Sequence, residues 1–170
     1  MGVISNLDIQ VKLKGRARLP ALHVAGRATN SPELEYGVLY RFWEQQLTRG
    51  LLDELVTYLP DRLIEDTTIA VYGLKPGALY RYLIGAMIAS QQTVPSRFDH
   101  VSIPGGHYWH FIVRAPYWIE TEELWQTVKQ RCSCQAVDSA TYGIELYTNQ
   151  YIQSQEIRQI EFLMPAEVVG

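Results

Sequence analysis

The chain has 170 residues, of which 47% are hydrophobic and 19% are charged, and its formal net charge is −3. This length and composition predict one globular domain with a substantial core, and they exclude a low-complexity or disordered chain. The weakly acidic balance, with no Lys/Arg cluster to oppose it, argues against direct binding of nucleic acid.

The sequence also bears on the cellular compartment. No stretch approaches the length of an apolar membrane span, and the first residues lack the basic and apolar parts of a signal peptide. The two cysteines, Cys132 and Cys134, lie two positions apart and are poor disulfide partners. We therefore expect a cytoplasmic protein with no membrane contact.

The predicted elements alternate between strands and helices along the chain. Strands are predicted from β-branched and alternating segments bounded by turn residues, over residues 8–29, 67–74, 79–89, 98–114, 136–148 and 153–164. A first main helix is predicted from the capping residue Asn30 to Gly50, with a short second piece over 51–58. A second main helix is predicted to begin at a Thr121 cap and to bury Leu124, Trp125, Val128 and Cys132.

The order strand, helix, strand, strand occurs twice. Gly15 and Pro20 interrupt the first strand and Pro104 interrupts its counterpart, while Trp43 and Trp125 occupy corresponding helices. We therefore predict an α+β fold of tandem β-α-β-β modules, about 8–90 and 98–165, related by a pseudo-two-fold within a single domain, 1–170. Its sheet should be mostly antiparallel, and the junction of the modules should form a central ligand groove.

The strand from Tyr142 to Tyr147 contains the most distinctive pattern. Alternation places Gly143, Glu145 and Tyr147 on one face, with Ile144 and Leu146 on the other. If the first face lines a cavity, Glu145 is an anion among aromatic rings, which suits a cationic ligand. If that face meets solvent, Glu145 is an ordinary surface acid.

Four segments together resemble the GyrI-like small-molecule-binding domain, the effector-binding domain of AraC- and MerR-type multidrug regulators. They are Arg18-Leu-Pro-Ala-Leu-His-Val-Ala-Gly26, Ile103-Pro-Gly-Gly-His-Tyr108, Gly143-Ile-Glu-Leu-Tyr147 and Ile160-Glu-Phe-Leu-Met-Pro165. The resemblance implies a groove between two modules, with Glu145 matching the groove glutamate of cation-binding members. The chain departs from the family pattern at Ile144, where phenylalanine is usual, and at Leu83, where many members carry an aspartate after the Arg-Tyr pair.

The residues around Glu145 suggest what the site would contain. In an empty apolar pocket the pKa of Glu145 would rise, and an aromatic cation would supply the missing counter-charge. Candidate ligand-binding residues around Glu145 are Tyr147, Tyr72, Tyr82, Tyr108, Trp109 and Trp43. Only one of Tyr108 and Trp109 can face the groove because they alternate on one strand. Core packing is the alternative for Tyr72, Tyr82 and Tyr108, and Trp125 is expected in the core.

Two other groups of residues suggest sites. His107, His110, Cys132 and Cys134 do not have the spacing of a structural zinc site, so we expect no metal and no cofactor. Tyr117 and Trp118, together in a predicted loop, suit either a pocket lid or a contact with a protein partner.

Three functions follow from these patterns. The first is binding of lipophilic cationic small molecules by a sensor or sequestering protein, which has no helix-turn-helix segment of its own. The second is hydrolysis of electrophilic small molecules, as in some stand-alone family members, with Glu145 as general base. The third is a protein-interaction or inhibitor role carried by the loop of Tyr117 and Trp118. Of the first two functions, hydrolysis is the less expected.

Overall fold

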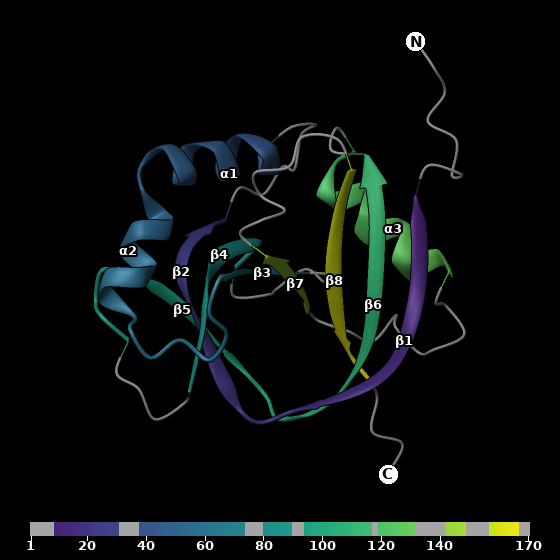
Figure 1. The fold of residues 1–170 in the computed structure, drawn as a ribbon, viewed down its shortest axis with the longest axis horizontal. Coiled ribbons are helices and arrows are strands. Elements are labelled where there is room, and N and C mark those ends of the chain that lie inside the picture. The colour runs from purple at the N-terminus through teal and green to yellow at the C-terminus, as the bar shows by residue number, and fades with distance from the viewer. Residues whose placement is uncertain are drawn as a thin grey trace.

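The computed structural model describes residues 9–30, 38–73, 80–89, 94–116, 119–131, 142–148 and 157–166. Within these ranges the chain forms the elements shown in Figure 1. The strands are β1 (Gln10–Leu19), β2 (Leu22–Thr29), β3 (Thr67–Gly73), β4 (Tyr82–Ala89), β5 (Asp99–Ile103), β6 (Gly106–Pro116), β7 (Tyr142–Thr148) and β8 (Ile157–Pro165). The helices are α1 (Val38–Thr48), α2 (Leu51–Tyr58) and α3 (Thr121–Arg131).

The strands form one antiparallel sheet in the order β1-β6-β8-β7-β3-β4-β2-β5. This order is symmetric about the contact between β7 and β3, because each half contains two strands of one repeat with the repeat's bent strand beside them. The predicted α+β class with a mostly antiparallel sheet is therefore confirmed. The centre of the sheet is the junction between the two repeats.

Two bent strands connect the halves. β1 leads into β2 through Pro20 and Ala21, and β5 leads into β6 through Pro104 and Gly105. These two long strands pair with each other, since Leu19 pairs with Gly106 on one side of the bends and Leu22 pairs with Ile103 on the other. In Figure 1 they cross together below the rest of the sheet. As a result, β1 completes the half built by the second repeat, and β5 completes the half built by the first.

The proline positions were predicted correctly, but Gly15 does not end a strand. β1 continues through Gly15 with a register shift between Leu13 and Gly15, and the φ of Gly15 is 125°, which favours glycine. The bulge keeps β1 paired with β6 on both sides. It also changes which side chains of β1 share a face, because the extra residue reverses the alternation.

The described helix ends agree with the sequence pattern at Gly50 but differ from it at Thr121. Gly50, with φ 83°, separates α1 from α2, so the predicted end of the first helix and the short second piece are both confirmed. The predicted helix start over residues 31–37 lies outside the described residues. Thr121 is the first residue of α3 rather than its cap, with Glu122 and Glu123 in the first turn and basic residues in the last.

The two faces of the sheet carry separate cores. The helix-side core contains Leu39 of α1, Leu55 of α2 and Trp125 of α3, packed against sheet residues such as Tyr82 and Phe162. The opposite-face core contains Val24, Val71, Leu83, Tyr108, Ile144 and Leu163. The predicted faces of the strand around Glu145 are confirmed, since Ile144 belongs to the opposite-face core and Tyr147 to the helix-side core.

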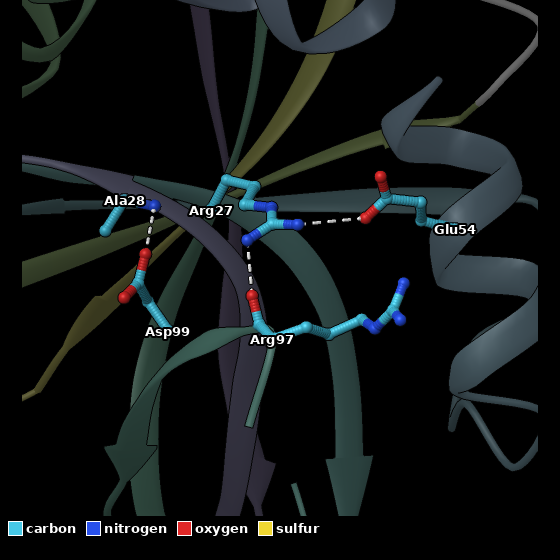
Figure 2. Close-up of polar contacts among 5 residues, drawn as sticks. All are labelled: Arg27, Ala28, Glu54, Arg97 and Asp99. Carbon is cyan, nitrogen blue, oxygen red and sulfur yellow. Dashed lines mark hydrogen bonds and ion pairs between the residues drawn. The ribbon is translucent and has the colours of Figure 1, made fainter. Parts of the chain in front are cut away.

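A polar group attaches α2 to the edge of the sheet (Figure 2). The Arg27 guanidinium donates to the Arg97 carbonyl and to Glu54 Oε2, the latter at 3.1 Å, while Asp99 accepts from the Ala28 amide at 2.9 Å. The Arg27 and Glu54 side chains are 36% and 30% exposed, so their ion pair contributes at most about 1 kcal/mol. These contacts position α2; they do not form a site with Glu145.

Among the helices that the structure describes, none combines the length and the apolar character needed to cross a membrane.

Candidate functional site

Glu145 lies at the centre of the sheet. It is the middle residue of β7 and pairs directly with Ala70, the middle residue of β3, across the junction of the two halves. Its side chain points to the helix-side face and is 0% exposed. A carboxylate is among the least favourable groups to bury, so its presence here requires compensating contacts.

Three aromatic side chains supply those contacts. The Tyr82 hydroxyl of β4 donates to Oε1 at 2.8 Å, and the Tyr147 hydroxyl, two residues along β7, donates to the same oxygen. The Trp125 indole of α3 donates to Oε2 at 2.8 Å. Hydrogen bonds to an ionised group are roughly twice as strong as neutral ones, so this arrangement stabilises the charged carboxylate.

Trp125 reaches the carboxylate because β7 has a glycine beside it. A Cβ added at Gly143 would lie 2.2 Å from Trp125 Cη2, so any other residue at this position would displace the indole. On its other side the indole stacks on Phe162 of β8, with ring centroids 4.3 Å apart. Trp125 is therefore fixed between α3 and the sheet, and its N–H is aimed at Glu145.

The first repeat covers the site with a second tryptophan. Trp43 of α1 donates from its indole to the Tyr82 hydroxyl at 3.0 Å, and its ring lies 4.9 Å from that of Tyr147. Unlike Trp125, which is buried, Trp43 is partly exposed. Trp43 is thus the outer member of the group and contacts Glu145 through Tyr82 and Tyr147.

Tyr72 of β3 extends the aromatic group to its charged margin. Its ring lies 6.1 Å from both Tyr82 and Trp125, and the Arg81 guanidinium lies 5.7 Å from its centroid. Burial and the nearby Glu122 carboxylate, which accepts a hydrogen bond from it, raise the pKa of Tyr72 to about 12. Burial, then the charge of Glu145, raises the pKa of Tyr82 well above its ordinary value. Both phenols therefore remain neutral donors at physiological pH.

The structure brings together most of the residues that the sequence suggested. Glu145, Tyr147, Tyr82, Tyr72 and Trp43 form one group on the helix-side face, which we call the Glu145 cluster together with Trp125. Each of these aromatic residues is also part of the helix-side core or packs against it. The alternative of core packing therefore applies to the same side chains as the predicted ligand-binding role.

Tyr108 and Trp109 lie away from this cluster. As their alternation predicted, they occupy different faces, Trp109 against the helix-side core and Tyr108 in the opposite-face core. Trp109 is covered by the guanidinium of Arg16 at 4.7 Å. The Tyr108 hydroxyl bonds to the Pro104 carbonyl at 2.7 Å and to the Tyr142 hydroxyl at 2.6 Å, so Tyr108 holds the β5–β6 bend rather than facing Glu145.

Sequence reasoning expected a carboxylate without partners in an apolar pocket, and the structure corrects this point. Among the residues that the structure describes, three neutral donors give Glu145 a hydrogen bond. The contribution of Trp125 was missed because its helical spacing marked it only as core, which it also is. The available signal was Gly143, since glycine inside a strand often marks the close approach of a bulky neighbour.

Metal ligands do not gather in the part of the chain that the structure describes. No group of three or more His, Cys, Asp and Glu side chains is arranged there to hold an ion. His110 instead contacts Glu161 Oε1 at 3.0 Å. Cys132, Cys134, Tyr117 and Trp118 lie outside the described residues, so the proposals attached to them stay predictions.

Comparisons with known proteins give the fold. No protein-family model matches the chain, and no curated protein matches it. Among solved structures, the chain is similar to a proposed bacterial transcription regulation protein of Staphylococcus aureus Mu50, with TM-score 0.63, 15% identity, and 92% of this chain and 99% of that chain covered.

Two further structures share the same arrangement. SAV2435, solved with tetraphenylphosphonium bound, has TM-score 0.59 and 12% identity, with 92% of this chain and 94% of that chain covered. An integron cassette protein from the mobile metagenome of Vibrio cholerae has TM-score 0.50 and 12% identity, covering 93% and 99%. At these identities the similarity is one of fold, and it spans nearly the whole of each chain.

Proposed function

We propose that the chain is a GyrI-like small-molecule-binding domain, 1–170, whose Glu145 cluster binds lipophilic aromatic cations. The single observation that carries the proposal is a fully buried carboxylate held in place by three neutral aromatic donors. Glu145 serves as the counter-charge, and Tyr147, Tyr82, Tyr72, Trp43 and Trp125 serve as the aromatic surroundings. The protein would act as a sensor or as a sequestering agent for such compounds.

The donors make this carboxylate suitable for a cation. The Tyr82, Tyr147 and Trp125 side chains stabilise the anion without carrying a positive charge, so they hold the carboxylate without neutralising it. Because the group is shielded from water, a cation placed near it gains more from the attraction than it would at the surface. The donors also fix both carboxylate oxygens, so the carboxylate itself need not reorient when the cation arrives.

The aromatic rings supply the second part of recognition. A cation over a tyrosine or tryptophan face gains roughly 0.5–2 kcal/mol when solvent is excluded. Flat rings set few directional requirements, so we expect broad selectivity for hydrophobic cations that carry planar aromatic rings rather than a single tight-binding compound.

Access to Glu145 requires a ring to move, because the carboxylate is 0% exposed. Trp43 is the partly exposed member of the cluster and contacts both Tyr82 and Tyr147. An aromatic ring of the ligand could take the place of the indole beside Tyr147 and restore the contact that Trp43 loses. This exchange favours ligands that carry both a charge and a ring.

The similarity of fold to SAV2435 supports the same chemistry. Its ligand, tetraphenylphosphonium, carries a positive charge among four phenyl rings and has no hydrogen-bond donor. Such a cation attracts a carboxylate without competing for its hydrogen bonds. Hydrolysis is less favoured by this geometry, because Oε1 accepts two hydrogen bonds and Oε2 one from protein groups, which holds the carboxylate rather than presenting it to water.

The test is a titration of tryptophan emission with tetraphenylphosphonium and with triphenylphosphine oxide, a neutral aromatic compound. We expect saturable quenching by the cation only, with an affinity at least tenfold weaker in Glu145→Gln, because a tenfold change corresponds to the loss of about 1.4 kcal/mol. Glu161→Gln is the matched control, since it removes another strand carboxylate, one that contacts His110.

Glu161→Gln should bind the cation as the parent does. Circular dichroism and urea unfolding of each variant distinguish a lost site from a lost fold. Equal affinity for the cation and the neutral compound, or equal affinity in Glu145→Gln and the parent, would contradict the proposal.

A further inference from the structure

Basic residues gather on one edge of the sheet, so the sequence-based expectation that the chain has no Lys/Arg cluster is wrong for this edge, although the whole chain is weakly acidic. The sequence of β1, Gln-Val-Lys-Leu-Lys-Gly-Arg-Ala-Arg-Leu, has Lys or Arg at four of its ten positions and no acid. Its neighbour β6 adds His107, His110 and Arg114, again without an acid. The full chain, in contrast, has 15 Lys and Arg against 18 Asp and Glu. The charge is therefore unevenly distributed, with a positive region along β1 and β6.

β1 is also open. It is the first strand in the order of the sheet and pairs only with β6 among the described residues, so its other backbone edge has no strand beside it there. Its exposed residues include every basic side chain, and even Leu13 is 41% exposed. Figure 1 shows β1 as the long outer strand beside β6. A free edge of this length presents unpaired N–H and C=O groups along an extended backbone.

The basic side chains lie on both faces of this edge. Because of the bulge at Gly15, Arg16 and Arg18 pair with Trp109 and His107 on the helix-side face, while Lys12 pairs with Ile112 on the other. The Arg16 guanidinium carbon lies over the Trp109 ring, 4.7 Å from its centroid. An extended segment lying along β1 would therefore meet positive charge whichever face its side chains took.

Within the described residues no carboxylate neutralises this charge. The ion pairs found there are Arg27 with Glu54, and His110 with Glu161, and neither involves β1. The helix behind this half of the sheet, α3, has Glu122 and Glu123 in its first turn, but no ion pair joins them to β1. The basic side chains of β1 are thus available to an acidic partner.

We propose that β1 is a docking edge for an extended acidic segment of a partner protein, which adds to the sheet as a further strand. Backbone pairing gives such a segment its alignment, and the lysines and arginines select acidic side chains. A second copy of the chain is a poor occupant, because β1 against β1 would place like charges opposite each other. The edge lies three strands from β7, so the proposal does not depend on ligand binding at Glu145.

The test measures fluorescence anisotropy of labelled ten-residue peptides. The first repeats Glu-Val, and the second repeats Glu-Pro, which has the same charge but lacks the N–H at every second residue. A ten-residue oligothymidylate is the third probe. We expect the Glu-Val peptide to bind, with affinity decreasing as salt increases, and the other two probes to bind at least tenfold more weakly.

Two double variants locate the contact. Lys12→Glu/Arg18→Glu should weaken binding of the Glu-Val peptide at least tenfold, whereas Arg41→Glu/Arg49→Glu, which changes exposed residues in the first half of α1 and just after its end, should change it less than twofold. Both alter net charge equally. Tetraphenylphosphonium titration of Lys12→Glu/Arg18→Glu should match the parent, which separates this edge from the Glu145 cluster.

Hydrogen exchange provides a measurement on the unmodified protein. Added Glu-Val peptide should slow exchange of β1 amides and leave those of β5, the other end of the sheet, unchanged. The proposal is overturned if the Glu-Pro peptide binds as tightly, if the oligothymidylate binds more tightly, if both double variants weaken binding equally, or if no peptide binds.

Discussion

The two halves of the sheet have similar elements but contribute differently to its centre. Where the second repeat has Glu145 in the middle of β7, the first has Ala70 in the middle of β3, and the two residues pair directly. The symmetry of the strand order places this pair at the junction of the halves. A carboxylate at both positions would put two like charges side by side in a buried region, so only one half can carry the acid.

The two helical tryptophans differ in the same way. Trp125 is buried and donates directly to Glu145, whereas Trp43 is partly exposed and reaches it through the Tyr82 hydroxyl. The second repeat thus supplies the carboxylate and its fixed donor, and the first supplies Tyr82 and the outer ring. The comparison shows how a duplicated fold can produce one asymmetric site, because the two repeats hold opposite sides of the same group.

The strongest way to break this asymmetry is Ala70→Glu. A second buried carboxylate opposite Glu145 would lower the free energy of unfolding by about 3–5 kcal/mol, the range for an uncompensated buried charge. Ala70→Gln is the control, since it adds similar volume without charge and should cost only about 1–3 kcal/mol through overpacking. Urea unfolding at neutral pH measures both, and equal losses for Glu and Gln would show that charge is not what restricts this position.

The difference between the tryptophans can be measured with Trp125→Phe and Trp43→Phe. Trp125→Phe leaves a buried carboxylate oxygen without its donor, so we expect a loss of about 1–3 kcal/mol. Trp43→Phe keeps a ring beside Tyr147 and removes only a hydrogen bond between neutral groups, so about 0.5–1.5 kcal/mol is expected. Urea midpoints give the comparison. A larger loss in Trp43→Phe would reverse the assignment of fixed and outer positions.

The smallest expected effect is the alkaline behaviour of Tyr72. Its pKa of about 12 in the folded protein exceeds the ordinary value of 10. Above pH 10 the unfolded chain releases this proton while the folded chain keeps it, so stability is complete below pH 10 and decreases as pH rises toward 12. Tyr72→Phe should therefore lose less stability than the parent between pH 9 and about 11.5. The variant still contains Tyr82, whose pKa is also raised, so its stability still decreases at alkaline pH, but by less than that of the parent.

Urea unfolding midpoints of the parent and of Tyr72→Phe, measured at pH 9 and about 11.5, test this prediction. The midpoint of Tyr72→Phe at neutral pH gives the stability that it loses with the hydrogen bond to Glu122, and this loss is subtracted from the comparison. Parallel decreases in the two proteins would mean that Tyr72 ionises equally easily when folded and unfolded.

The fold was largely predictable because local signals marked its elements. Pro20 and Pro104 marked the bends, Gly50 marked the helix end, and alternation around Glu145 identified the correct faces. The exchange of β1 and β5 between halves was not predictable, because pairing partners far apart in sequence leave no local pattern. Gly15 was predicted to interrupt the strand, whereas it forms a bulge within β1. Glycine is typical of both a bulge and a strand end, so the sequence could not distinguish them.

The site was predictable in part. A strand pattern can identify which face Glu145 occupies, but it contains no information about what lies on that face. Trp125 comes from α3 and Tyr82 from β4, and only their packing against β7 makes them donors. Tyr108 was separable from the cluster only once the sheet placed its hydroxyl beside the Pro104 carbonyl and the Tyr142 hydroxyl.

The exchanged strands also bear on how the chain reaches this fold. During synthesis β1 is made first, yet its partner β6 follows only after β2 to β5 have been made. Neither repeat can complete its half of the sheet alone, because the outer strand of each half, β1 or β5, comes from the other repeat. Pairs this distant in sequence slow folding, since a long loop must close before they form. The repeated order of elements therefore does not give two independent folding units, and β1 cannot pair with β6 until β6 has been made.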